Sequence, residues 1–272
     1  MKQKVIGIMG QKGGAGKSTL TNIIPNEILF KYSKRKKDCK ILVLDVDTQR
    51  SNSDLRERDV DILKMEIPSP FYDGLDKDDQ EQVRLMRTKF QFLNAKYGWK
   101  PYELKTVEME PNSINRGIEI LNSDGYDFVF LDFPGTLDQE GTGDLIEYVQ
   151  YMFIPTAKNT YDINSLTRFI EQINDIKWER LESIVFFFNK FEKIKDRQYN
   201  KVQTEIVQRF GYPFMRNRIN KTSIVESDYY NSLLPMSLNI NLNTQEVYPL
   251  AGVNFSQFTD ELLEIVNHNN KA

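Results

Sequence analysis

The sequence predicts an α/β fold in which a doubly wound, mostly parallel sheet is flanked by helices. Short apolar runs, each long enough for a strand, recur between longer segments of helical period, and this alternation is typical of that fold class. The runs are continuously apolar, as expected of strands that are buried on both faces. The predicted strands are residues 5–9, 41–44, 128–131, 151–154 and 184–188.

The helices are predicted from apolar residues that recur at spacings of three and four. Three segments show this spacing clearly, over residues 76–97, 163–173 and 255–266. In the last segment the acidic residues share the opposite face, which predicts a surface helix packed on the sheet. Pro25 falls in the helix after the first strand, where we expect it to kink or interrupt that helix.

The length of 272 residues fits one large domain or two small ones. We predict a single domain over residues 1–272, because the sequence has neither internal repeats nor a linker rich in proline, glycine or serine. Residues 60–112 fit the alternation of strands and helices less well, since a turn-rich loop over 68–74 precedes the charged helix. This stretch is either an insertion or one ordinary βαβ unit with a long loop.

The composition excludes several kinds of site. The chain has one cysteine, Cys39, and one histidine, His268, which rules out a disulfide framework, a Cys/His zinc site and an iron–sulfur cluster held within one chain. The same count argues against acid–base catalysis by histidine. The longest uninterrupted apolar run, 184–188, is far shorter than the roughly 20 residues that span a membrane. We therefore expect a cytoplasmic protein without stable membrane insertion.

A glycine-rich loop with the sequence GQKGGAGKST, from Gly10 to Thr19, follows the first predicted strand and precedes a helix. Such a loop directs backbone amides at phosphate oxygens, and the helix adds its positive end. Lys17 supplies a charge to the β- and γ-phosphates of a nucleotide, and Ser18 supplies a hydroxyl to Mg²⁺. The predicted nucleotide-binding residues of this loop are Gln11, Lys12, Gly13, Gly14, Ala15, Gly16, Lys17, Ser18 and Thr19.

The loop departs from the usual phosphate-binding pattern at two positions. Gln11 stands where the pattern G-x-x-x-x-G-K-[ST] has its first glycine, and an additional lysine, Lys12, precedes Lys17 by five residues. The spacing leaves two roles open for Lys12. It is either a solvated loop residue or a charge that reaches the nucleotide of a neighbouring subunit, as an arginine finger does.

The sequence K-G-G-x-G-K-S resembles the deviant Walker A motif of the ParA/MinD ATPases. Two further motifs follow in the order found in that family. The sequence DVDTQ over 45–49 resembles the D-x-D-P-Q-G switch, and VFLDFP over 129–134 resembles the Walker B motif. The resemblance implies a P-loop NTPase of the deviant Walker A type. It also implies that Lys12 acts across a nucleotide-sandwich dimer.

The resemblance gives roles to the aspartates at the strand ends, where ligands of open α/β sheets bind. Asp132 would reach Mg²⁺ through water beside Ser18, Asp45 would support the same site, and Asp47 would place the attacking water. Each aspartate could instead be an ordinary cap of a strand end. The implied catalytic residues are Lys12, Lys17 and Asp47, and the implied metal-binding residues are Ser18, Asp45 and Asp132.

Asn189 follows the last predicted strand and resembles the adenine-contacting position of the family. The sequence NKFE over 189–192 is also similar to the guanine-reading N-K-x-D of GTPases. We favour ATP, because the phosphate loop is of the ATPase group. Thr48 and Arg50 stand where the family's switch has proline and glycine. The resemblance therefore does not predict the rate of hydrolysis.

Basic residues concentrate in 190–221. This segment contains nine lysines and arginines but only three acidic residues, whereas the whole chain has a net charge of −3. Arg216, Arg218 and Lys221 are the densest part, and this region resembles the one in which ParA proteins carry DNA-binding arginines. Such a patch suffices for DNA binding without sequence preference, because phosphate contacts dominate the affinity. The alternative is a solvated basic face.

The predicted function is therefore that of a ParA-type ATPase. ATP would close a homodimer, the dimer would bind DNA non-specifically at the nucleoid, and a partner of ParB type would stimulate slow hydrolysis. Such a protein partitions or positions DNA or another cargo. One alternative is a MinD-type ATPase that cycles on membranes, against which the acidic C-terminal helix argues. Another is an ATP-dependent metabolic enzyme on the same fold, with a second substrate pocket built from residues 60–112.

Overall fold

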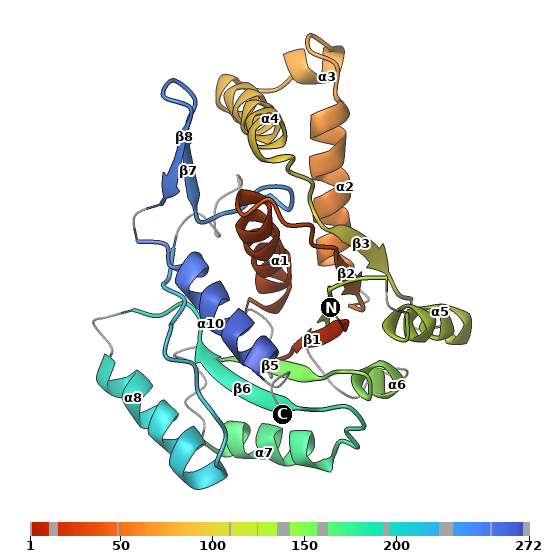
Figure 1. The fold of residues 1–272 in the computed structure, drawn as a ribbon, viewed down its shortest axis with the longest axis vertical. Helices are drawn as coiled ribbons and strands as arrows, with labels where there is room; N and C mark the ends of the chain where they lie inside the picture. Colours follow the sequence, from red (N-terminus) through yellow and green to blue (C-terminus); the bar gives the residue numbers. More distant parts are fainter. Residues whose placement is uncertain are drawn as a thin grey trace.

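Six parallel strands form the central sheet, in the order β3-β2-β4-β1-β5-β6 (Figure 1). β2 and β3 lie on one side of β1, and β5 and β6 lie on the other, so the sheet is doubly wound as predicted. The strands are β1 (Lys4–Ile8), β2 (Ile41–Asp45), β3 (Glu103–Thr106), β4 (Phe128–Asp132), β5 (Tyr151–Thr156) and β6 (Ser183–Phe188). The computed structural model describes residues 2–10, 16–47, 49–108, 110–123, 125–134, 142–156, 163–192, 196–222, 231–250 and 252–268.

The five predicted strands are confirmed as β1, β2, β4, β5 and β6, with bounds that differ by one or two residues. β3 was not predicted. Its four residues alternate between exposed and half-buried at the edge of the sheet. An edge strand of this kind has no continuous apolar run, so the pattern that identified the buried strands does not detect it.

Helices cover both faces of the sheet, because successive strand residues point to opposite faces and both sets are apolar. One face packs against α1 (Lys17–Lys34) and α10 (Phe255–His268). The other packs against α5 (Pro111–Leu121), α6 (Thr142–Ile146) and α7 (Ile163–Asp175). Two apolar layers therefore hold the strand ends in fixed positions.

The helices predicted over 76–97, 163–173 and 255–266 are confirmed as α4 (Lys77–Tyr97), α7 and α10. Of the kink or interruption expected at Pro25, the interruption is wrong, because α1 is one continuous helix from Lys17 to Lys34. Proline disfavours a helix interior by about 3 kcal/mol. The residues on both sides of Pro25 are buried, and their packing outweighs that cost.

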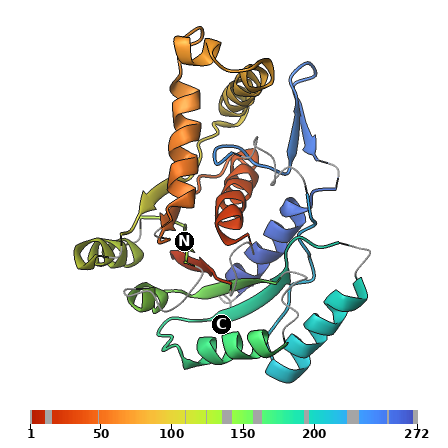
Figure 2. The same ribbon diagram turned by 180° about the vertical axis from the view of Figure 1, so that it is seen from behind.

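The connection between β2 and β3 stands out from the rest of the molecule. It consists of α2 (Ser51–Lys64), α3 (Pro70–Asp73) and α4, which rise beyond the sheet with α2 and α4 beside each other in both views (Figures 1 and 2). β3 then returns to the sheet parallel to β2. Most of the stretch 60–112 thus belongs to a helical crossover that begins and ends in the main sheet. The single domain over 1–272 stays a prediction.

Residues 231–250 fold back onto α1 and the end of α4. The indole nitrogen of Trp99 donates to the carbonyl of Leu233 at 3.0 Å, and the amide of Asn26 donates to the carbonyl of Ser232 at 2.9 Å. These contacts join parts of the chain that are far apart in sequence. The remaining elements are α8 (Asp196–Thr204), the π-helix η2 (Glu205–Arg209) and the antiparallel pair β7 (Leu238–Asn241) and β8 (Glu246–Pro249).

Candidate nucleotide-binding site

The carboxyl ends of β2 and β4 and the start of α1 meet at one edge of the sheet. Asp45 is the last residue of β2, Asp132 is the last residue of β4, and the two are register partners. α1 begins at Lys17, directly after Gly16. The structure therefore brings the end of the predicted phosphate loop next to two predicted metal-site aspartates. The loop residues that lie outside the described part of the chain are Gln11, Lys12, Gly13, Gly14 and Ala15.

Gly16 is required by both its backbone and its surroundings. It caps α1 in the left-handed region, with φ +82°, which glycine adopts without steric strain. A Cβ atom at this position would lie 2.6 Å from Nδ2 of Asn189. The first turn of α1 contains no acidic side chain, so the positive end of the helix dipole remains available to an anion such as a phosphate.

Side chains from the first turns of α1 face Asp132. An interaction with the Ser18 side chain acts to lower the pKa of Asp132. Thr21, which was not predicted, has its Oγ1 3.3 Å from Oδ1 of Asp132 and 2.9 Å from the Lys17 carbonyl. Lys17 is 7% exposed, and its charge acts to lower the pKa of Asp132. The predicted phosphate lysine and the predicted metal-site serine thus both lie close to the Walker B aspartate.

The carboxylate of Asp132 is in an environment that favours a cation. It is fully buried, and Nδ2 of Asn52 donates to its Oδ2 at 2.7 Å. Burial, followed by the negative charges of Asp45 and Asp47, raises the pKa of Asp132 to about 7. A divalent cation would relieve this repulsion. Carboxylates, a hydroxyl and retained water are the oxygen ligands that Mg²⁺ prefers, so the residues present fit the predicted Mg²⁺ site.

Asp45 fastens the first turn of α2 to the end of β2. Its Oδ2 accepts from the backbone nitrogen of Ser53 at 2.9 Å and from the Ser53 hydroxyl at 2.6 Å. The same hydroxyl lies 2.8 Å from Oγ1 of Thr106 in β3. Burial raises the pKa of Asp45, and the two bonds from Ser53 oppose that shift. Asp45 therefore positions α2, and its supporting role at the metal site stays a prediction.

Asp47 lies in the turn that leads from β2 into α2. It is half-buried, its Oδ1 accepts from the backbone nitrogen of Gln49 at 3.0 Å, and its carbonyl accepts from Arg50 at 2.9 Å. Arg50 caps α2 with φ +51°, a left-handed conformation that glycine would adopt at less cost. The arginine thus occupies a backbone conformation suited to glycine. Thr48 lies outside the described residues.

Asn189 connects the end of β6 to the start of α1. It is 5% exposed, its backbone nitrogen donates to Thr156 at 3.0 Å, and its side chain lies against Gly16. A cavity of about 80 Å³ opens beside it. The other residues lining this cavity include Thr19, Ile219, Asn220, Thr222 and Phe255. This position next to the phosphate loop is compatible with the predicted contact to the base of a nucleotide.

A chain of buried polar side chains leads to Asp132 and was not predicted. Tyr102 donates to Oδ1 of Asn22, and the amide of Asn22 donates to Oδ1 of Asn52, which in turn contacts Asp132. The sequence signal for Asn52 is weak: it follows the switch motif at the start of a helix, where asparagine is common for capping alone. Only the orientation of α2 shows that this amide faces the aspartate.

The predicted DNA-binding residues lie on a segment over 214–221 that runs beside β6. Arg216 is engaged with α10. Its backbone nitrogen donates to Oε1 of Glu261 at 2.8 Å, its Nε lies 3.4 Å from the same oxygen, and a terminal nitrogen lies 3.1 Å from Glu264. The acidic face of α10 therefore balances much of the charge of Arg216.

Arg218 and Lys221 are placed differently. The guanidinium of Arg218 lies 4.5 Å from the ring centroid of Phe191 and 3.4 Å from Oδ1 of Asn200. Lys221 is exposed, and its side chain has no ion-pair partner among the residues that the structure describes. The predicted basic patch is thus uneven, because only part of its charge faces solvent without a carboxylate partner.

Comparison with known proteins places this chain in a family. A sequence model described as an AAA domain matches residues 3–186. A search of curated proteins gave no match. Among solved structures, the MinD cell division protein of Aquifex aeolicus is 19% identical, with 96% of each chain covered and a TM-score of 0.57.

Two further solved structures come from a partition system and from a biosynthetic enzyme. A proposed plasmid partition protein of Borrelia burgdorferi B31, bound to AMPPNP, is 19% identical, with 98% of this chain and 100% of that chain covered and a TM-score of 0.54. Cobyrinic acid a,c-diamide synthase of Mycobacterium smegmatis, with bound ADP and magnesium, is 14% identical, with 99% and 96% covered and a TM-score of 0.53. The chain therefore belongs to the AAA domain family that its sequence matches, and its fold is similar to that of MinD and of the proposed plasmid partition protein.

Proposed function

We propose that this protein binds ATP with Mg²⁺, closes into a homodimer, binds DNA without sequence preference and hydrolyses ATP under stimulation by a partner protein of ParB type. In this role it would partition or position DNA or another cargo. The proposal rests chiefly on the convergence of Lys17, Ser18 and Asp132 at one edge of the sheet. This arrangement brings the end of the predicted phosphate loop, at Lys17 and Ser18, next to the predicted Walker B aspartate.

Each part of the site has a defined task in this proposal. The amides at the start of α1 and Lys17 hold the phosphates of ATP. Ser18, Asp45 and Asp132 would hold Mg²⁺, partly through water, and the ion would supply positive charge to the phosphate oxygens. Asp47 orients the attacking water, since its turn leaves the carboxylate half-buried at the same edge. Lys12 contacts the nucleotide bound by the partner protomer.

DNA binding is proposed for Arg216, Arg218 and Lys221. The support is the excess of basic residues in 190–221 and the exposure of Lys221. Arg216 would have to exchange its contacts with the glutamates of α10 for a phosphate, so we expect it to contribute less than the other two. Dimerisation doubles the number of such contacts, and binding should therefore require ATP.

The DNA proposal is tested by a salt series with two unrelated duplexes. Alanine at Arg216, Arg218 and Lys221 should weaken binding of the ATP-bound dimer and flatten the slope of log affinity against log salt by about 0.9 for each lost phosphate contact. The control removes three exposed charges at and just after the C-terminal end of α1, at Lys34, Arg35 and Lys37.

Three outcomes would count against this DNA assignment. They are a strong preference for one duplex, wild-type binding by the alanine variant, and an equal loss in the control. A lower affinity with an unchanged slope would instead indicate a lost dimer or misfolding.

A second candidate function, an ATP-dependent metabolic enzyme, is favoured by one observation. A cavity of about 690 Å³ is lined in part by residues 58–89, where such an enzyme would need its second substrate pocket. High turnover in the absence of DNA and partner protein would support this candidate. For the MinD-type alternative, the described helices include none that is long and apolar enough to span a membrane, and binding to liposomes in ATP would test it.

A further inference from the structure

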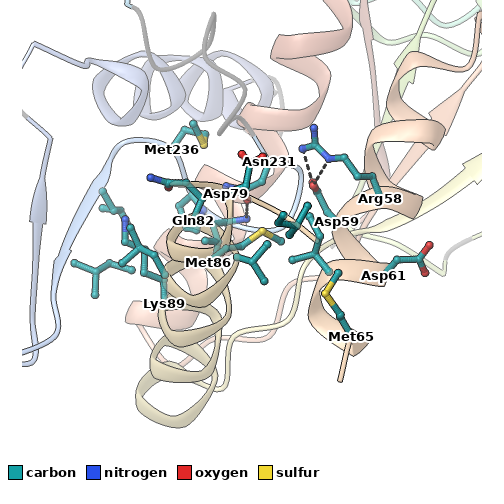
Figure 3. A pocket seen from close by; sticks show the side chains of 18 of the residues that line it. Arg58, Asp59, Asp61, Met65, Asp79, Gln82, Met86, Lys89, Asn231 and Met236 are labelled. Atoms are coloured by element: carbon teal, nitrogen blue, oxygen red, sulfur yellow. Dashed lines mark hydrogen bonds and ion pairs between the residues drawn. The ribbon is translucent and has the colours of Figure 1, made fainter. Parts of the chain in front are cut away.

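An apolar cavity lies between the helical crossover and the segment 231–250, away from the phosphate loop. Its volume is about 690 Å³, within the range of ligand-binding pockets and much larger than the cavity beside Asn189. Figure 3 shows side chains from α2 on one side and from α4 on the other, with Asn231 and Met236 from the third segment.

The lining of the cavity extends along two helices. On α4 the lining runs from Asp79 to Lys89, which is about 15 Å, and from Arg58 of α2 to Met65 at the C-cap of that helix, which is about 10 Å at 1.5 Å per residue. An amphipathic helix that docks in a groove uses anchors at i, i+3, i+4 and i+7, which span about 10 Å. The length of the groove thus matches two turns of a docked helix.

The lining can adapt to the shape of a ligand, and it includes an exposed aromatic residue. Three methionines, Met65, Met86 and Met236, contribute to it, and methionine packs against varied shapes because its side chain is unbranched and polarisable. Phe71 also lines the cavity and is 67% exposed. A large exposed apolar side chain beside a groove is typical of a protein interaction site.

The charges around the cavity favour a basic partner. Arg58 and Asp59 neutralise each other at 2.7 Å. Asp61 and Asp79 are exposed and have no ion pair within the described parts of the chain. Lys89 is the one remaining basic residue of the lining, so the charged side chains of the lining are three aspartates against one arginine and one lysine. The groove therefore presents carboxylates that a lysine or arginine could pair with.

α2 links this groove to the nucleotide site. In its first turn, Asn52 donates to Asp132 and Ser53 donates to Asp45. About 10 Å further along the same helix, Asp59 is fully buried and accepts from the backbone nitrogen of Ser232 at 2.6 Å. A ligand that shifts α2 against the segment 231–250 would therefore also shift groups that contact the metal-site aspartates.

We propose that this cavity is the docking groove for an amphipathic, lysine- or arginine-bearing helix of the stimulating partner, and that α2 transmits its binding to Asp45 and Asp132. The inference deepens the proposed function and rests on it for the identity of the occupant. Docking of the helix and binding of the nucleotide are then linked. The bound helix changes the affinity for the nucleotide by the same factor as the bound nucleotide changes the affinity for the helix.

The docking site is tested with a fluorescent helical probe of about 14 residues, built from leucine and lysine with the leucines on one face. Binding is measured by fluorescence polarisation without nucleotide. Met86→Trp, which fills the groove, and Phe71→Arg, which adds a repulsive charge, should each weaken binding about tenfold or more, as does the loss of one packed anchor. Val207→Arg replaces another exposed apolar residue, 42% exposed and remote from the lining, and should leave binding unchanged.

Thermal unfolding should show a cooperative transition for each variant, as a control that the variant is folded. A probe with glutamate in place of lysine should bind more weakly than the lysine probe. Equal binding by all three variants would overturn the docking site. So would self-association of the wild type that Phe71→Arg abolishes, since the occupant would then be a second copy of the chain. Binding of the small apolar dye anilinonaphthalene sulfonate, blocked by Met86→Trp, in the absence of probe binding would also overturn the proposed occupant.

The coupling is tested by repeating the measurement with ATP and Mg²⁺. Wild-type affinity for the probe should change by about fivefold or more. Asn52→Ala and Asn22→Ala should still bind the probe, but their affinity should no longer respond to ATP. An unchanged wild-type affinity in a protein that demonstrably binds ATP would refute the coupling. A protein that binds no ATP would instead refute the proposed function, while the nucleotide-free measurement still decides whether the groove binds a helix.

Discussion

The location of some functional residues could be predicted from the sequence, as Lys17, Ser18 and Asp132 show. Their motifs follow strongly apolar strands, so their common location at one edge of a parallel sheet was predictable. Asn52 was not predictable, because its hydrogen bond to Asp132 depends on how α2 is turned. The pairing of Arg216 with Glu261 was also missed, since the two residues are 45 positions apart.

The removal of the phosphate lysine gives the most direct residue-level prediction. Lys17→Ala should abolish ATP binding at the concentrations used in calorimetry. A hydrogen bond to a charged group contributes about 1.5–3 kcal/mol, and this side chain is expected to contact both the β- and γ-phosphates. Lys34→Ala, at an exposed position in the last turn of the same helix, is the control. ATP binding of wild-type strength by Lys17→Ala would rule out the phosphate-loop assignment.

Among the elements, β3 and α1 show where local patterns fail. β3 is too polar and too short to be recognised as a strand, and only its pairing with β2 defines it. α1 continues through Pro25 because the helix is buried along most of its length. In both cases tertiary contacts outweigh the local preference of the sequence.

The burial of α1 has a consequence for the pH dependence of stability. Glu27 is 1% exposed and accepts from the backbone nitrogen and the hydroxyl of Ser237 at 2.8 and 2.5 Å. Burial raises the pKa of Glu27 above 4.5 in the folded protein. The folded state therefore holds this proton more tightly than the unfolded chain. This stabilisation is fully present below pH 4.5 and is lost as the pH rises through the folded pKa.

Replacement of Glu27 by glutamine should remove this dependence, because glutamine does not titrate. The difference in Tm between wild type and Glu27→Gln should become less favourable to the wild type as the pH rises from about 4.5 to 8. Thermal unfolding over that range measures it. Glu119→Gln, at an exposed position of α5, serves as the control. A constant difference across the range would show that Glu27 does not titrate differently in the two states.

For the whole molecule, the doubly wound parallel sheet was predictable from the sequence, whereas the order of its strands and the groove were not. The groove forms where α2 and α4 meet a segment that lies more than 130 residues later in the chain, and no local pattern indicates such a meeting. The assembly of two molecules is likewise a property of the whole chain. Its key residue, Lys12, was identified from the motif alone and lies outside the described residues.

The measurement that tests the central claim most directly is the molar mass in solution, by light scattering, with and without ATP and Mg²⁺. The wild type should change from the 31.9 kDa of one chain to twice that mass. Asp47→Ala should form a longer-lived dimer, because only the placement of water is lost, and Lys12→Ala should bind ATP yet remain a monomer. A wild type that binds ATP and stays monomeric, or a Lys12→Ala variant that dimerises like Asp47→Ala, would contradict the claim that ATP closes a dimer through this lysine.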